Sequence, residues 1–130
     1  MRRIRLAMLT VVALAALAAP ALAESPLNPF VLTKHCAGPV CTVDSSPLAA
    51  IPPGTEIDYL GPQYGTPVLS SQVIIYGLGG TATGHCTWAV TPSGTCTIEH
   101  GTGTLAGFHA HVAVGSSDFV NFTWTGTYQQ

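Results

Sequence analysis

Apolar and polar residues alternate one by one over most of the chain from residue 55 to residue 130. A period of two is typical of β-strands that pack one face and leave the other face polar. No stretch in this part repeats its apolar residues with the 3.6-residue period of a helix. The pattern predicts an all-β domain built from antiparallel hairpins. Run by run, the predicted inward residues are Ile57 and Tyr59; Leu69, Val73 and Ile75; Ala82, Cys86, Trp88 and Val90; Cys96 and Ile98; Ala106, Phe108, Ala110, Val112 and Val114; and Val120, Phe122, Trp124 and Tyr128.

Turn-forming residues separate these runs. The segments Thr91-Pro92-Ser93-Gly94 and Gly101-Thr102-Gly103-Thr104 carry residues that supply a fixed or positive φ. Two residues paired directly across a ladder point to the same side of the sheet. If Ile98 and Phe108 both point inward, the numbers of any paired residues in this hairpin add up to an even number, so the loop between the strands has an odd number of residues. A two-residue tight turn is therefore excluded between these two strands.

The first 23 residues have the layout of a secretory signal peptide. Three arginines precede an apolar run from residue 6 to residue 19, and the small-residue site Ala21-Leu22-Ala23 follows Pro20. The run is shorter than the roughly 20 residues that a membrane-spanning helix needs. We expect cleavage before Glu24 and a free protein that is secreted or periplasmic, with no membrane association after cleavage.

Residues 24–54 differ from the rest of the mature chain. They hold six of the ten prolines and show little periodicity. This composition predicts an irregular N-terminal arm, pinned to the domain by a small disulfide loop. The expected organisation is a signal peptide at 1–23, the arm at 24–54 and the β domain at 55–130.

The chain has four cysteines, Cys36, Cys41, Cys86 and Cys96. In an exported protein an even number of cysteines indicates disulfides rather than metal ligands. Sequence permits three pairings. We favour the local one, Cys36 with Cys41 and Cys86 with Cys96, because Cys86 and Cys96 fall on one face of adjacent predicted strands.

The charge balance excludes several classes of partner. Beyond the signal peptide, Lys34 is the only basic residue against six acidic residues, so the mature chain has a net charge of −5 and no arginine. Binding to nucleic acid, to anionic lipid and to phosphorylated ligands depends on lysine and arginine. We therefore expect none of these three partners.

Three segments of the C-terminal half have a common character: Gly79-Gly-Thr-Ala-Thr-Gly-His-Cys86, Gly101-Thr-Gly-Thr-Leu-Ala-Gly-Phe-His-Ala110 and Trp124-Thr-Gly-Thr-Tyr128. Together they resemble small secreted bacterial proteins of the allene oxide cyclase and dirigent barrel type, over about half of the mature chain. The resemblance implies a single antiparallel β-barrel of about eight strands. Plant members guide the coupling or cyclisation of apolar substrates with arginine or acidic groups in the barrel. The mature chain has no arginine to match, so no catalytic residue is carried over.

Four aromatic residues with inward parity are the candidates for ligand binding: Trp88, Phe108, Trp124 and Tyr128. Aromatic residues in such positions usually form the core. In a barrel wide enough to hold a cavity, the same residues would line an apolar pocket.

His109 and His111 are the candidates for a metal site. They are two residues apart on a predicted strand, so both point the same way, as pairs of zinc ligands do in several β-based sites. His85 and Glu99 lie on the same polar face and would complete a site for zinc or copper. A solvent-exposed polar face that carries hydrogen-bonded, inert histidines also explains the pattern, and we favour that interpretation.

No motif for catalysis stands out, so the sequence leaves open whether the protein is an enzyme. Serine nucleophile motifs are absent, and the Gly-x-Gly pairs at residues 77–79 and 101–103 open no helix and are turn glycines. The favoured interpretation is a secreted, non-enzymatic β-barrel without a resident cofactor that binds a small apolar molecule or a protein surface. One alternative is an isomerase- or cyclase-like, dirigent-type barrel. The other is a metal-binding protein that uses the His-x-His strand.

Overall fold

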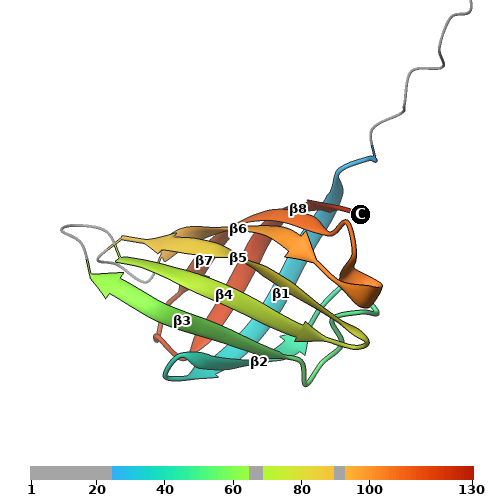
Figure 1. The fold of residues 1–130 in the computed structure, drawn as a ribbon. Coiled ribbons are helices and arrows are strands. Elements are labelled where there is room, and N and C mark those ends of the chain that lie inside the picture. Colours follow the sequence, from blue (N-terminus) through green and yellow to red (C-terminus); the bar gives the residue numbers. More distant parts are fainter. Residues whose placement is uncertain (1–24, 65–68, 90–92) are drawn as a thin grey trace, which may run out of the picture.

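The computed structural model describes residues 25–64, 69–89 and 93–130. They form a closed barrel of eight strands, in which each strand pairs antiparallel with the next and β8 returns to pair with β1 (Figure 1). A short 3-10 turn, η1, precedes β7, and no helix in the described ranges is long and apolar enough to cross a membrane. The all-β barrel expected from the sequence is confirmed. Its strands are β1 (Asn28–Ala37), β2 (Val40–Ser45), β3 (Glu56–Tyr64), β4 (Leu69–Gly77), β5 (Gly80–Trp88), β6 (Ser93–Gly101), β7 (His109–Ser116) and β8 (Asn121–Gln129), with η1 at Gly103–Leu105.

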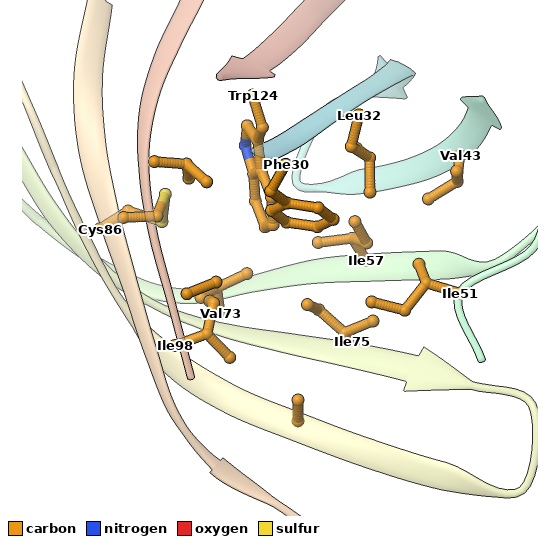
Figure 2. Packing of buried hydrophobic residues seen from close by; sticks show 14 of the residues in the cluster. Phe30, Leu32, Val43, Ile51, Ile57, Val73, Ile75, Cys86, Ile98 and Trp124 are labelled. Carbon is orange, nitrogen blue, oxygen red and sulfur yellow. A yellow bond between two sulfur atoms is a disulfide. The ribbon is translucent and has the colours of Figure 1, made fainter. Parts of the chain in front are cut away.

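The alternating pattern places one face of every strand inside the barrel. Apolar side chains from facing strands converge on the barrel interior, as Figure 2 shows for Phe30, Ile57 and Trp124. The ladder between β6 and β7 pairs Ile98 with Ala110, so the loop has the odd parity that the sequence requires. Two predicted inward residues, Ala106 and Val120, are exposed because they lie in loops outside the strands.

The predicted irregular arm at residues 24–54 is wrong for most of its length. Residues 28–37 and 40–45 are the first two barrel strands, and only the segment 46–55 is irregular. The reason is closure, because β1 pairs along its length with β8 and without it the sheet would keep two open edges. The barrel therefore begins at Asn28 rather than at residue 55. The predicted signal peptide lies outside the described residues.

Both disulfides have the predicted local pairing. Cys36 bonds to Cys41 across the β1–β2 hairpin, and Cys86 bonds to Cys96 between β5 and β6. Each pair faces directly across its ladder. Two disulfides are compatible with an oxidising location outside the cytoplasm.

The barrel has two different ends. At the end where the chain enters β1 and leaves β8, the segment 46–55 and η1 cover the interior, and Ile51 and Leu105 have no exposed surface. The Leu78 N–H donates to the Ala50 carbonyl at 2.8 Å, and the Leu78 carbonyl accepts from the Thr104 hydroxyl at 2.6 Å. We call this the terminal end. The opposite end, which carries the β1–β2 turn and the β7–β8 loop, is called the Lys34 end.

Glycines let neighbouring strands approach closely, and Gly126 in β8 gives a testable case. A Cβ built at Gly126 would lie 2.0 Å from the backbone oxygen of His111. We therefore expect Gly126→Ala to lower the free energy of unfolding by about 3 kcal/mol, since overpacking a strand against backbone forces it to move. Urea denaturation measures this loss. Gly115→Ala in β7 is the matched control, because its Cβ would meet nothing within 4 Å. Equal losses in the two variants would contradict the steric explanation.

Candidate functional site

Lys34 is buried inside the barrel. The alternation in β1 puts it in phase with Phe30 and Leu32 on the inner face, and only 1% of its surface is exposed. It is also the only lysine of the chain, and the arginines all lie within the first five residues. Lysine is almost never fully buried without a charged partner. Its position therefore calls for an explanation beyond filling the core.

Aromatic side chains surround the Lys34 amine. Its Nζ donates a hydrogen bond to the Tyr59 hydroxyl at 2.6 Å and lies 4.5 Å from the centre of the Tyr59 ring. The rings of Phe122 and Trp124 are each 5.1 Å from Nζ. Trp88 packs edge-on against Tyr59 and Phe122, with ring centres 5.6 and 6.1 Å apart. We call these five residues the lysine cage. Aromatic faces attract a cation, so these rings favour the protonated amine, whereas its burial disfavours the charge.

No carboxylate of the described residues neutralises Lys34. The nearest groups beyond the rings are the disulfide sulfurs, 3.8 Å (Cys36) and 3.6 Å (Cys41) from Nζ. In the part of the chain that the structure describes, the only salt-bridge geometry joins His35 to Asp44 at 2.8 Å, and both of those side chains are about half exposed. The charge of Lys34 is therefore balanced only by π-faces, a hydroxyl and weakly accepting sulfur.

Burial shifts the acid–base behaviour of both polar groups in the cage. Desolvation lowers the pKa of Lys34 from 10.5 to about 7. Burial also raises the pKa of the Tyr59 hydroxyl well above its usual value, and the Trp124 side chain lowers it to a smaller extent. Near neutral pH the site therefore combines a partly neutral amine with a hydroxyl that keeps its proton.

The cage holds a further donor that is only weakly satisfied. The indole Nε1 of Trp124 is buried and lies close enough to the Tyr59 hydroxyl to lower its pKa, but the geometry falls short of a full hydrogen bond. A buried donor without a full hydrogen bond costs free energy and calls for an explanation, such as a ligand or ordered water. Lys34, Tyr59 and Trp124 thus form a set of polar groups that can all donate to one acceptor.

A depression in the surface lies beside the cage. It has a volume of about 570 Å³, and Lys34, Val114 and Phe122 are among the residues that line it. Most of the other lining residues, among them Thr33, Asp44, Ala113 and Thr123, are outward-facing residues of β1, β2, β7 and β8, so the depression opens on the outer side of the barrel wall and one carboxylate lines it. Pockets for small molecules have volumes of about 300–1,000 Å³. The depression is therefore large enough for a small ligand.

Exposed apolar residues surround this end of the barrel. Phe119 is 65% exposed, and Val120, Val40 and Leu60 are each more than 40% exposed. The Val120 carbonyl accepts from the Cys36 N–H at 2.8 Å, which places the β7–β8 loop next to the disulfide of the cage. Leu27 and Leu78, at 67% and 68%, are even more exposed and lie at the terminal end, so exposed apolar surface does not by itself distinguish the two ends.

Asp118 fixes the loop that presents Phe119. Its Oδ1 accepts hydrogen bonds from the backbone N–H groups of Val120 at 2.9 Å and Asn121 at 2.7 Å. These bonds, led by the one from Asn121, hold the pKa of the Asp118 carboxyl well below its usual range. Phe119 itself has a φ of 59°, a conformation rare for an aromatic residue. Such backbone strain persists only where the surrounding contacts impose it, as they do here.

The structure divides the four predicted ligand-binding aromatics between the two ends. Trp88 and Trp124 belong to the lysine cage. Phe108 and Tyr128 lie at the terminal end, where their ring centres are 5.8 and 5.6 Å from that of Phe30. Of the other three cage residues, Tyr59 and Phe122 were predicted to face inward from the alternation, and only Lys34 was not predicted to lie inside the barrel.

The predicted metal ligands lie on the outside of the barrel. His109 and His111 are exposed on β7, and His111 Nδ1 is 3.1 Å from the Thr97 hydroxyl. His85 in β5 also faces Thr97 across the β5–β6 ladder, so Thr97 separates these two histidines. Within the described ranges, the structure brings together no group of three or more histidine, cysteine, aspartate or glutamate side chains that could hold a metal ion. Glu99 is the extra residue of a bulge in β6.

Comparisons with protein-family models, with curated proteins and with solved structures found no match for this chain.

Proposed function

We propose that the protein is an extracytoplasmic binding barrel that takes up one small apolar molecule at the Lys34 end and holds the polar group of that molecule against the Lys34 amine. The observation that carries this proposal is the burial of the only lysine against three aromatic rings, with no carboxylate partner among the described residues. Apolar walls with a few convergent polar groups are the usual composition of small-molecule sites.

A purely structural role explains the cage less well. A methionine or leucine at position 34 would fill similar volume without the cost of desolvating an amine. Groups whose pKa is strongly shifted by burial are concentrated at functional sites. The weakly satisfied Trp124 donor supports the same interpretation.

The polar groups of the cage favour ligands that accept hydrogen bonds. The amine of Lys34, the hydroxyl of Tyr59 and the indole N–H of Trp124 all donate, and no other charged side chain in the described residues is buried. A carboxylate or carbonyl group would satisfy these donors, and a carboxylate would also pair with protonated Lys34. A ligand amine would be repelled. We therefore propose an apolar acid or carbonyl compound as the ligand class.

The proposed location rests on two supports. One is the signal-like N-terminus, and the other is the pair of disulfides. The dirigent-type alternative relies on arginine or acidic groups in the barrel. Among the described residues the buried polar or charged side chains are instead Lys34, Thr55 and Ser71, which supports binding over that chemistry.

Tryptophan fluorescence tests the proposal directly, because the two tryptophans of the chain, Trp88 and Trp124, both belong to the cage. We expect octanoate at pH 7 to change the emission and to bind at least about 10-fold more tightly than octylamine, a difference of about 1.4 kcal/mol. Lys34→Met should abolish this preference. The outward-facing variant His109→Ala is the control and should keep it. The proposal is wrong if neither octanoate nor octanol alters the emission, or if octylamine binds best.

A further inference from the structure

We infer that Lys34 captures small apolar aldehydes covalently: its amine condenses with the carbonyl carbon to form an imine, and the Tyr59 hydroxyl supplies the proton for the departing water. This inference rests on the proposed function, because the aldehyde would occupy the same apolar end of the barrel. It adds a covalent step and names the ligand class.

The geometry provides a nucleophile and an acid in direct contact. The Lys34 Nζ and the Tyr59 hydroxyl oxygen are 2.6 Å apart, which is within the range for proton transfer. The surrounding rings of Tyr59, Phe122 and Trp124 limit how the amine can move. Their apolar surfaces also exclude water, and the exclusion of water favours a condensation that releases water. Nothing else on the inner face of the described barrel offers a comparable pair.

The reaction is balanced without any oxidant or reductant. The lone pair of neutral Nζ forms a bond to the carbonyl carbon as the carbonyl π-bond breaks, and proton transfer from nitrogen to oxygen gives a carbinolamine. Tyr59 then protonates the carbinolamine oxygen, which leaves as water while the nitrogen lone pair forms the C=N bond. The resulting tyrosinate takes the proton back from the iminium nitrogen. The net change is amine plus aldehyde to imine plus one water.

The charge state of the cage supports this chemistry. A solvent-exposed lysine is neutral in fewer than about one molecule in a thousand at pH 7. Burial lowers the pKa of Lys34 to about 7, so a large fraction of the amine is neutral there. Tyr59 stays protonated because burial raises its pKa. Among the described residues, Tyr59 is the only titratable side chain that contacts the amine.

Reductive trapping tests the inference. The folded protein would be treated with octanal and cyanoborohydride at pH 7, and its peptides analysed by mass spectrometry. We expect the peptide that contains Lys34 to gain the mass of octanal less one oxygen atom, at least 10-fold faster than in urea-unfolded protein. Because Lys34 is the only lysine, peptide mapping separates its adduct from that of the N-terminal amine.

Substitutions test whether the adduct forms in the lysine cage. Lys34→Arg should give no internal adduct, and Tyr59→Phe should slow trapping by about 10-fold or more. Tyr76→Phe, on the outer face of β4, is the matched control and should react as the wild type does. Trapping no faster than in the unfolded chain overturns the inference. If octanoate and octanol still change the tryptophan emission, the proposed function survives that result; if they do not, both fail.

Discussion

Replacing Lys34 with methionine is expected to make the protein more stable at pH 6, by about 3–5 kcal/mol in the free energy of unfolding. A pKa that falls from 10.5 to about 7 on folding corresponds to roughly 5 kcal/mol of cost for burying the charged amine. Methionine fills a similar volume and carries no charge. The lost hydrogen bond to Tyr59 offsets about 1 kcal/mol of the gain.

The shifted pKa of Lys34 also determines how the stability of the wild type changes with pH. The folded pKa of Lys34 lies below its unfolded value, so between about pH 7 and pH 10 the unfolded chain binds the proton and the folded protein does not. The wild type should therefore gain about 1.4 kcal/mol of stability per pH unit across this window, and should carry the full penalty below it. Lys34→Met should lack this slope. Above pH 10 the raised pKa of Tyr59 acts in the opposite direction, since the unfolded tyrosine ionises first.

Urea denaturation from pH 6 to pH 9.5 measures both effects. Val31→Met is the matched control, because Val31 is on the same strand but 51% exposed, and such surface changes usually stay within about 0.5 kcal/mol. A Lys34→Met variant less stable than the wild type at pH 6, with an unchanged slope, would show that the amine stabilises the barrel. The predicted gain in the free energy of unfolding would instead mean that Lys34 destabilises the wild-type protein, as residues of functional sites often do.

The inward-facing residues of β5 to β7 could be predicted because the pattern that identifies them is local in the sequence. Period-two alternation depends only on neighbouring residues, so it identified the inward residues of β5, β6 and β7 and the face shared by Cys86 and Cys96. The same parity set the odd loop between β6 and β7. These features follow from the pleat of a strand and need no knowledge of distant contacts.

The first strand and the lysine cage could not be predicted in this way. Lys34 is in phase with Phe30 and Leu32, but the surrounding prolines masked that alternation. The prolines lie at the second position of β1, in its turn, or outside the strands, where they interrupt no interior pairing. Lys34 is buried because β8 closes on β1, where it pairs with Phe122, a residue 88 positions later in the chain (122 − 34). Tyr59 and Phe122 reach the amine through the same closure.

Removing the Cys86–Cys96 disulfide in a double alanine variant is expected to lower the free energy of unfolding by about 4 kcal/mol. Releasing a loop of this length, with its cysteines 10 residues apart, accounts for about 2–3 kcal/mol in the chain-entropy model. Both cysteines are fully buried, so the smaller alanines also leave a cavity in the core. Urea denaturation of the oxidised wild type and the variant measures the difference.

The Cys36–Cys41 disulfide provides the contrast. Its cysteines are 5 residues apart and Cys36 is partly exposed, so the matching double alanine variant should lose only about 2 kcal/mol. Its sulfurs contact the Lys34 amine, and Cys41 belongs to the same hydrophobic core as Cys86 and Cys96. Loss of the Cys36–Cys41 disulfide should therefore change the rate of aldehyde trapping at Lys34 more than loss of the Cys86–Cys96 disulfide does. Loss of the Cys86–Cys96 disulfide should instead have the larger effect on the free energy of unfolding. If stability and trapping fell in the same order, the Cys36–Cys41 disulfide would have no role in shaping the cage.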